Sequence, residues 1–375
     1  MVAQGSYSTL ASFDPVNVSI LVGRLPGRLR IEPRIFGPYP MTETLERLSR
    51  YRELVDDWPA FIDSCRKPLP KVVWTNPLRQ SALLSLGAPG ASSGLSAGPD
   101  RLSGPDLLTA TSILAARLGA RGYSSQPVNW YPGALRVFGI EKPGKTLEFY
   151  LGLYHVQEEI SLLPAVLLGA GPGERVLDLC AAPGGKTAQI ACHMENSGTL
   201  VANDIRPNRL RALRSNCERL GLLNVAVSSH DGTRFPLEVG QFDRVLLDVP
   251  CSCEGNVRQS GEIPFEQAGG VTGRAGLQAT LLGRAWKLLS PGGVLVYATC
   301  TFAPEENELV LDYVLGDDAT IEPVEIEGLR ASAGVTEWNG LGLRSDCRNV
   351  ARFWPHLNDT GGFAAARIRK QGEAG

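Results

Sequence analysis

The sequence predicts an α/β protein in which a large domain with a parallel sheet follows a smaller α+β module. Two observations support this fold class. After about residue 144, short apolar runs alternate with amphipathic segments, and before that point no such alternation occurs. The length of 375 residues suits a domain of roughly 200 residues with a smaller companion. We therefore assign residues 1–40 to an N-terminal arm, 41–143 to the module and 144–375 to the large domain.

The arm is rich in proline and glycine and shows no sustained period. In the module, apolar residues at helical spacing predict a helix that begins at Thr42, and Pro59 begins a second, short helix. The segment KVVWTNPLR predicts a strand. A loop of small residues then leads to another helix, LLTATSILAARLGARG, which ends at a glycine.

Charge and composition narrow the possible functions. The formal net charge is −2, so the chain as a whole does not attract nucleic acid and local patches must do so. The acid-free stretch 64–99 contains Arg66, Lys67, Lys71 and Arg79, and it is either a contact for a phosphate backbone or a solvated basic face. No apolar run reaches roughly 18 residues and no signal sequence is evident, so we expect no membrane contact and a cytoplasmic location.

Five apolar runs predict the strands of the large domain. They are RVLDLC, TLVAND, VAVSSHD, DRVLLDVP and GVLVYATC. Each run ends in a polar or reactive residue. Because ligands of such sheets bind beyond the carboxyl ends of the strands, these terminal residues form the candidate site.

The first strand leads into the segment LDLCAAPGGKT. Pro183, Gly184 and Gly185 predict a tight turn that lets the backbone approach a ligand, and the next helix begins with unpaired N–H groups. The spacing differs from the GxxxxGK[ST] pattern of a phosphate-binding loop. The turn therefore indicates a ligand site of another kind.

Acidic residues end the next two strands. Asp204 is placed to accept hydrogen bonds from ribose hydroxyls, and Asp231 suits an exocyclic amine of adenine. Either acid could instead cap a helix. Acids at successive strand ends favour a nucleoside ligand.

The fourth strand leads to Asp248 and Cys251, and the fifth to Cys300. If these strands are neighbours, about 4.8 Å apart, a carboxylate and two thiols share one pocket. A thiolate in front of a helix is stabilised, so we expect both thiols to be reactive. A zinc site formed by Cys251, Cys253 and Cys300 is the alternative, but a CxC pair without a nearby histidine is poor zinc spacing, and we assign no metal.

The other cysteines are interpreted as structural. The chain has eight cysteines and no CxxC pair, which indicates reduced thiols rather than a disulfide framework. We expect Cys65, Cys180, Cys192 and Cys217 to act as small apolar side chains.

This set of groups fits methylation at C5 of a pyrimidine. Carbon 5 of cytosine is a poor nucleophile until a thiolate adds to C6, after which it can attack the sulfonium methyl group of S-adenosylmethionine. The second thiol would assist release of the product. An acid close to N3 would stabilise the adduct, and Asp248 stands in that place.

From about Tyr150 onward the sequence resembles the NOL/NOP/Sun family of RNA cytosine-5 methyltransferases. The resemblance is carried by HVQEEIS, VLDLCAAPGGKT, NDIRPNRLRALRSNCERLG, HDGTRFP, FDRVLLDVPCSCEG, LLSPGGVLVYATCTFAPEENE and RFWPHLNDTGGFAAARIRK. It implies a Rossmann-like, S-adenosylmethionine-dependent methyltransferase domain. The module before it, with RYRELVDDWPAFIDSCRKPLPKVVWTN and PVNWYPGALRVFG, is similar to the RNA-binding N-terminal domain of bacterial members.

The resemblance also implies roles for individual residues. Cys300 in TCT is the implied nucleophile, Cys251 in PCS the implied aid to product release, and Lys186 and Asp248 lie close to the target base. The implied cofactor contacts are Ala182, Pro183, Gly184, Gly185, Lys186, Asp204, Arg209, Asp231, Gly232 and Asp248.

Two departures from the family pattern alter the expected pocket wall. The family usually carries DPPCSG or DAPCSG, whereas here Val249 precedes the proline, and Cys253 and Glu254 precede Gly255. The last motif keeps only Phe363 as an aromatic residue after its glycines. Neither departure removes an implied catalytic residue.

Competing functions fit less well. A DNA cytosine-5 methyltransferase would carry PCQ and ENV motifs, which are absent, so we expect no DNA substrate. An amino-methylating enzyme would have an aromatic residue where Cys251 stands. An inactive RNA-binding assembly factor would not need both Cys251 and Cys300.

The partner expected from the sequence is RNA. We favour ribosomal RNA, with transfer RNA as the alternative, and expect a monomeric enzyme. Trp130 and Tyr131 either stack on a base or fill the contact between the domains, and the second interpretation is slightly favoured.

Overall fold

The structure is a computed structural model that describes residues 46–79, 105–260 and 270–372, all of which belong to the unit 39–375. The predicted arm, the start of the helix expected from Thr42 and most of the loop of small residues lie outside the described ranges.

The large sheet contains the five strands that the sequence predicts. They are β5 (Arg175–Asp178), β6 (Thr199–Asn203), β7 (Val225–Ser228), β8 (Phe242–Asp248) and β9 (Leu289–Thr299). These strands lie in the order β9-β8-β5-β6-β7, and every neighbouring pair is parallel. The predicted α/β, Rossmann-like architecture is confirmed.

Beyond β9 the sheet continues with antiparallel strands that the sequence patterns did not predict. β15 (Phe363–Lys370) pairs with β9, and β14 (Ala351–Phe353), β11 (Ser332–Ala333) and β10 (Ala319–Glu322) extend this edge. The sheet is therefore mixed rather than wholly parallel. The run FAAARIRK was missed because alanine has a low strand propensity and the charged residues interrupt the apolar pattern.

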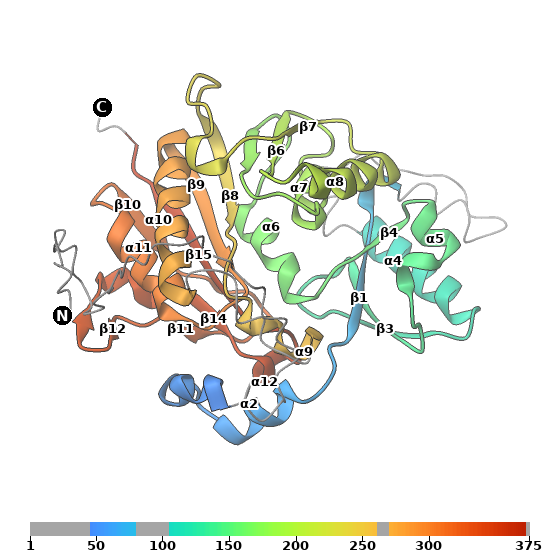
Figure 1. The fold of residues 1–375 in the computed structure, drawn as a ribbon. Coiled ribbons are helices and arrows are strands. Elements are labelled where there is room, and N and C mark those ends of the chain that lie inside the picture. Colours follow the sequence, from blue (N-terminus) through green and yellow to red (C-terminus); the bar gives the residue numbers. More distant parts are fainter. Residues whose placement is uncertain (1–45, 80–104, 261–269, 373–375) are drawn as a thin grey trace, which may run out of the picture. The chain divides into compact units, whose positions relative to one another are not determined.

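Successive strand residues enter two different cores, one on each face of the sheet. Leu246 and Val296 belong to one core, and their neighbours Val245 and Leu295 belong to the other. Figure 1 shows α6 (Leu163–Leu168) and α7 (Gly185–His193) on one side, with α10 (Gly270–Leu288) and α11 (Glu308–Val314) on the other. Because helices cover both faces of the sheet, a ligand site is expected at the carboxyl ends of the strands.

A second, four-stranded sheet is formed mainly by the predicted module. Its order is β2-β3-β1-β4, with β1 (Lys71–Thr75), β2 (Ser124–Pro127), β3 (Ala134–Phe138) and β4 (Tyr154–Val156), and α4 (Pro105–Gly119) packs against it. The strand β4 comes from the segment that we assigned to the large domain. The boundary at residue 143 is thus not a boundary between sheets, and the domain division stays a prediction.

The two sheets are joined by specific contacts. The Asn76 side-chain amide, just after β1, donates to the carbonyl oxygens of Gly152 and Leu220 at 2.9 Å each. Trp130 is only 8% exposed, belongs to the core beneath α6, and donates from Nε1 to Glu159 at 3.1 Å. The interpretation of Trp130 as a core residue is confirmed.

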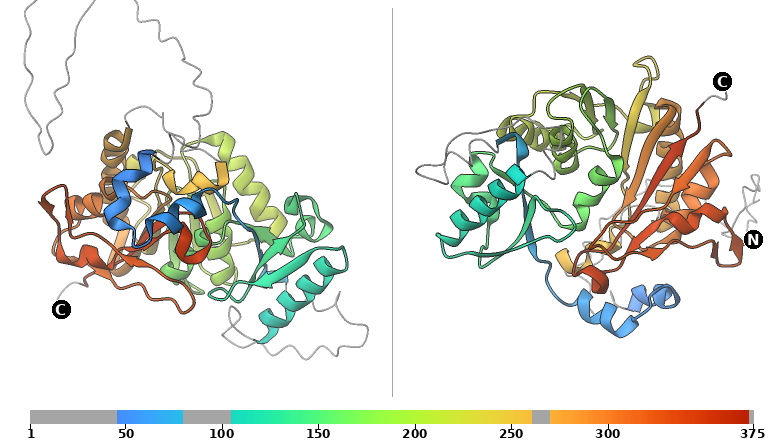
Figure 2. Two further views of the ribbon diagram at one scale, coloured as in Figure 1. Left: turned by 90° about the horizontal axis from the view of Figure 1, so that it is seen from below. Right: turned by 180° about the vertical axis from the view of Figure 1, so that it is seen from behind.

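A short helical segment packs at the end of the large sheet. The predicted helix at Pro59 is α2 (Trp58–Cys65), and Asp57 caps it by accepting from the Ala60 N–H at 3.0 Å. Before it, Ser49–Leu54 forms a 3-10 helix, η1. Figure 2 shows α2 beside α9 (Val257–Ser260) and α12 (Pro355–Asn358), where Phe61 meets Trp354 edge to face.

The remaining elements connect these layers. They are η2 (Pro77–Arg79), η3 (Pro143–Lys145), α5 (Leu147–Tyr150), η4 (Ile160–Leu162), α8 (Pro207–Leu220), η5 (Gly232–Arg234), η6 (Glu254–Asn256), η7 (Pro304–Glu306), η8 (Ser345–Asn349), β12 (Glu337–Trp338) and β13 (Leu341–Gly342). Within the described ranges, no helix is long and apolar enough to cross a bilayer.

Candidate active site

The predicted catalytic residues lie at the carboxyl ends of neighbouring strands. Strands β8 and β9 pair in parallel with Asp248 opposite Ala298, which brings the following loops together. These loops carry Cys251 and Cys300, so the neighbouring strands expected from the sequence are confirmed. The structure places their sulfurs 3.3 Å apart.

Lys186 and Asp248 form an ion pair in this region. The Lys186 Nζ lies 2.8 Å from Asp248 Oδ2 and 5.8 Å from the centre of the Phe363 ring. Burial opposes the charge on Lys186, but the Asp248 carboxylate outweighs it, and the net pKa of Lys186 is raised. A negative charge on Cys300 would add to the same effect.

A cavity of about 160 Å³ opens beside this ion pair. It is lined by His155, Val156, Gln157, Ser161, Asp178, Cys180, Ala181, Ala182, Pro183, Gly185, Lys186 and Asp248. Five of the predicted cofactor residues line this space: Ala182, Pro183, Gly185, Lys186 and Asp248, whereas Gly184 of the same turn does not. Asp204, Arg209, Asp231 and Gly232 do not.

Asp178 is a cavity residue to which the sequence patterns gave no role. It ends β5 and is 1% exposed; its Oδ2 accepts from the Thr187 hydroxyl at 2.7 Å, and its Oδ1 has no partner. Burial is the largest cause that raises the pKa of Asp178, to about 7, and the nearby Asp248 adds to it. An unpaired buried carboxylate oxygen in a cavity suits a cationic group of a ligand.

In the predicted turn, the backbone of Gly184 and Gly185 lies close to neighbouring side chains. Gly184 has a φ of 103°, and a Cβ atom there would lie 3.2 Å from Leu213. A Cβ atom on Gly185 would lie 3.1 Å from the Gln157 side-chain oxygen. Both positions therefore favour glycine, and the N-terminus of α7 faces the cavity.

Asp204 and Arg209 form a second group at the end of β6. The Asp204 Oδ1 accepts from the Arg206 N–H at 2.8 Å, and its Oδ2 accepts from Arg209 at 3.2 Å. Arg209 also donates to the carbonyl oxygen of Ala182. Arg209 thus ties the acid to the glycine turn, and Asp204 is 4% exposed.

Asn203, which the sequence patterns also missed, fixes three strand ends. Its side chain donates to the carbonyl oxygens of Leu179 and His230 and accepts from Ser228 Oγ and the His230 N–H. The residue stands directly before Asp204. A polar residue at the buried end of an apolar strand was the signal that could have revealed it.

Asp231 caps η5, as the alternative interpretation of this acid allowed. It accepts from the backbone N–H and the hydroxyl of Thr233 at 2.9 and 2.7 Å. These hydrogen bonds lower the pKa of Asp231. Gly232 follows it, and a Cβ atom there would lie 2.8 Å from Leu281. A cofactor contact by either residue stays a prediction.

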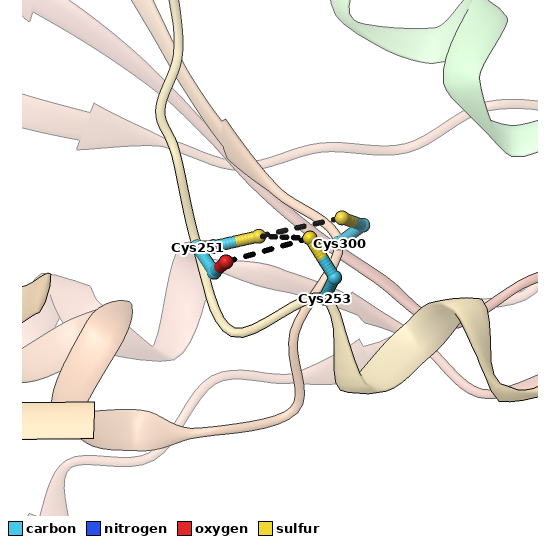
Figure 3. A group of neighbouring side chains, drawn as sticks. All are labelled: Cys251, Cys253 and Cys300. Carbon is cyan, nitrogen blue, oxygen red and sulfur yellow. Dashed lines mark hydrogen bonds between the residues drawn. The ribbon is translucent and has the colours of Figure 1, made fainter. Parts of the chain in front are cut away.

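Three thiols meet at the loops after β8 and β9. The Cys251 sulfur lies 3.3 Å from that of Cys300 and 3.9 Å from that of Cys253. All three sulfurs lie within 4.8 Å of one another, and Figure 3 shows them turned toward a common point. These are the three cysteines that the sequence offered as an alternative zinc site, and the structure brings their sulfurs together.

The three neighbouring thiols shift one another's pKa in opposite directions. Hydrogen bonds from Cys251 and Cys300 lower the pKa of Cys253 to about 3. The pKa of Cys251 is raised by its hydrogen bonds to Cys253 and Cys300. The hydrogen bond with Cys251 lowers the pKa of Cys300, but Cys253 and burial outweigh it, and the net pKa is raised. These directions favour the protonated thiols of Cys251 and Cys300, and the reactivity expected of both stays a prediction.

Glu254, one of the departures from the family pattern, holds the loops together. Its carboxylate accepts from the Tyr51 hydroxyl at 2.7 Å and from the Thr301 hydroxyl at 3.0 Å. Thr301 also lies 2.6 Å from the Ser252 hydroxyl. The residues beside both predicted catalytic thiols are thus fixed through one buried acid.

The predicted basic stretch has protein partners at several positions. Lys67 pairs with Asp63 at 2.5 Å, and Lys71 donates to the carbonyl oxygens of Ile140 and Glu141 at 2.8 and 2.7 Å. Residues 80–99 of this stretch lie outside the described ranges. The solvated basic face is favoured for Lys67 and Lys71.

The mixed sheet, with a glycine turn, a cavity and acids at its carboxyl ends, defines an S-adenosylmethionine-dependent methyltransferase. The family described as 16S rRNA methyltransferase RsmB/F matches residues 165–369, which is more than half of the chain. The chain belongs to this family.

Two relatives and one solved structure illustrate the similarity. The tRNA (cytosine(49)-C(5))-methyltransferase of Pyrococcus abyssi is 40% identical over 253 residues, 66% of this chain and 81% of that protein. The ribosomal RNA small subunit methyltransferase F of Vibrio atlanticus is 34% identical over 324 residues, 84% of this chain and 60% of the relative. A methyltransferase homolog protein from Pyrococcus horikoshii has a TM-score of 0.70 at 30% identity, covering 88% of this chain and 98% of that one.

Proposed function

We propose that this methyltransferase transfers the methyl group of S-adenosylmethionine to C5 of cytosine in RNA, through a covalent bond between Cys300 and C6 of the base. The observation that carries the proposal is the pair of thiols, 3.3 Å apart, at the strand ends beside the Lys186–Asp248 ion pair. The names of the relatives from Pyrococcus abyssi and Vibrio atlanticus support the reaction.

The residues around the cavity fit the cofactor. S-adenosylmethionine, when bound, supplies an electrophilic methyl group on a sulfonium. The unpaired oxygen of Asp178 suits a cationic group of this molecule, and the buried Asp204 suits its ribose hydroxyls. The glycine turn lets the backbone approach it.

The reaction divides between the two thiols. The Cys300 sulfur forms a bond to C6 of the cytosine, and C5 becomes nucleophilic enough to accept the methyl group. Asp248, held by Lys186, stabilises the adduct at N3 of the base. After methyl transfer, C5 loses its proton and the bond between Cys300 and C6 breaks. Cys251 assists this release.

The raised pKa of Cys300 has a consequence for this mechanism. The resting thiol must lose its proton before it attacks, so the reactive fraction grows as the pH rises toward the pKa. Methyl transfer is therefore expected to accelerate from neutral to alkaline pH until another step limits the rate.

We propose ribosomal RNA as the substrate, with transfer RNA as the second candidate. The match to the RsmB/F family favours ribosomal RNA, whereas the relative from Pyrococcus abyssi favours transfer RNA. The cytoplasm is the proposed place of action, because no membrane-spanning helix was found in the described ranges and the RNA substrates occur there.

Bisulfite sequencing of total RNA tests the reaction and its substrate together. RNA from a strain that lacks the protein should lose one or more 5-methylcytosines, and the wild-type gene should restore them while the Cys300→Ala gene should not. Loss of a site in ribosomal RNA supports the favoured substrate, and loss in transfer RNA supports the second candidate. Unchanged methylation in both RNAs contradicts the proposal.

A further inference from the structure

Cys253 has a backbone conformation that a cysteine rarely adopts. Its φ is 60° and its ψ is 25°, in the left-handed region that residues other than glycine rarely adopt. A strained residue beside an active site points to a function for its side chain. The feature of this side chain is its thiol, which faces Cys251 and Cys300 (Figure 3).

The three sulfurs are spaced as ligands of one metal ion. A tetrahedral ion with metal–sulfur bonds of about 2.3 Å holds its sulfurs about 3.8 Å apart. The sulfurs of Cys251 and Cys253 are 3.9 Å apart, those of Cys251 and Cys300 are 3.3 Å apart, and all three lie within 4.8 Å. Small side-chain movements convert this triangle into a coordination shell.

The surroundings of the cluster favour thiolate ligands. Arg274 donates to the carbonyl oxygen of Cys251 at 2.8 Å, which places a positive charge next to the loop that carries Cys251 and Cys253. The Asn256 amide lies 3.5 Å from the Cys300 sulfur and can support it as an outer partner. Thiolates select soft ions such as zinc over magnesium or calcium.

Against the assignment of no metal from the sequence spacing, we propose that Cys251, Cys253 and Cys300 bind one thiophilic divalent cation, such as zinc, and that the bound ion inhibits methyl transfer. Each protonated thiol releases its proton to solvent as its sulfur binds the ion. Among the described residues, no fourth histidine, cysteine or acid completes the group, so one position of the ion stays open. The inhibition rests on the proposed function, because it requires that Cys251 and Cys300 are the working thiols.

A metal titration tests the site without RNA. The metal-free protein, kept reduced with a phosphine, is titrated with cadmium, whose bonds to thiolates absorb in the ultraviolet. We expect one ion per chain with thiolate absorption. The Cys253→Gly variant removes one ligand, and glycine suits the left-handed backbone at this position. It should bind cadmium at least about a hundredfold more weakly, because mutation of residues that only hydrogen-bond to metal ligands already lowers metal affinity by up to about a hundredfold.

A matched control separates the cluster from the other thiols. Cys217 is a half-buried thiol of α8 outside the cluster, so Cys217→Ser should bind cadmium like the wild type. Competition with a zinc chelator should give the same order of affinities. Equal affinities of the wild type and Cys253→Gly, or binding without thiolate absorption, would overturn the site.

Methyl transfer in the presence of zinc tests the inhibition. Zinc should stop the wild-type enzyme and a chelator should restore it, whereas Cys253→Gly should keep its activity at the same zinc concentration. Equal sensitivity of both proteins would overturn the inhibitory role. If the proposed reaction itself fails, the wild type shows no transfer without zinc, and the cadmium titration still decides the metal site.

Discussion

At the residue scale, the site is built from buried ionisable groups whose partners are only partly supplied by the protein. Lys186 and Asp248 satisfy each other, but Asp178 keeps one unpaired oxygen. A buried group without a partner lowers stability unless a ligand completes it. The wall of the cavity is therefore arranged for a charged ligand rather than for stability.

Asp178 should make the protein less stable as the pH rises. Its pKa is raised from 3.8 to about 7 in the folded state, so between these values the folded protein binds more protons than the unfolded chain. The free energy of unfolding should fall from about pH 4 to about pH 7 relative to that of Asp178→Asn. Urea unfolding of both proteins across this range measures it, and parallel pH profiles would contradict the assignment.

Asp204 should contribute to cofactor affinity through charge-assisted hydrogen bonds. Each such bond is worth roughly 1.5–3 kcal/mol, so Asp204→Ala should bind S-adenosylmethionine at least about tenfold more weakly. Calorimetry compares it with Glu238→Ala, which removes an exposed acid from the turn before β8. An affinity of Asp204→Ala within twofold of the control would remove this residue from the cofactor site.

At the element scale, the loops after β8 and β9 depend on a helical segment distant in sequence. Tyr51 of η1 is fully buried and donates to Glu254, which also holds Thr301 next to Cys300. The first described helical turns therefore support the catalytic loops. Sequence spacing does not predict this contact, because Tyr51 and Glu254 lie 203 residues apart in the chain.

Removal of the Tyr51 hydroxyl should weaken this support. Tyr51→Phe leaves the buried Glu254 with one donor fewer, and the free energy of unfolding should fall by about 1–3 kcal/mol. Tyr150→Phe, at a site that is 66% exposed, is the matched control and should be nearly neutral. Denaturant unfolding measures both, and equal stabilities would show that the contact contributes nothing.

At the scale of the whole molecule, RNA must be held by local basic residues, because the chain carries a net charge of −2. Lys67 and Lys71 already have protein partners, which weakens the case for the basic stretch of the module. The exposed arginines Arg206, Arg211 and Arg214, in α8 and directly before it, are further candidates.

Replacement of Arg206, Arg211 and Arg214 by alanine should reduce the salt dependence of RNA binding. Each phosphate contact to single-stranded RNA contributes about −0.7 to the slope of log affinity against log salt, so three contacts contribute about two units. A salt titration compares this variant with the Arg66, Lys67 and Lys71 triple variant. A larger change of the slope in the second variant would show that RNA binds to the basic stretch of the module instead.

Local patterns were sufficient to predict the five parallel strands and the residues that end them. Apolar runs define such strands, and Asp248 and Cys300 follow directly from where the runs stop. The antiparallel edge, the unpaired oxygen of Asp178 and the contact between Tyr51 and Glu254 were not predictable. Each of these depends on contacts between segments far apart in the chain, which no local period encodes.

Covalent trapping on RNA tests the central claim, the division of work between the two thiols, most directly. The wild type, Cys251→Ala and Cys300→Ala are incubated with substrate RNA and S-adenosylmethionine and run on a denaturing gel. Cys251→Ala should accumulate a stable protein–RNA adduct, because the bond from Cys300 to C6 forms but is not released, and Cys300→Ala should form none. A stable adduct with Cys300→Ala and none with Cys251→Ala would contradict the account and reverse the two roles.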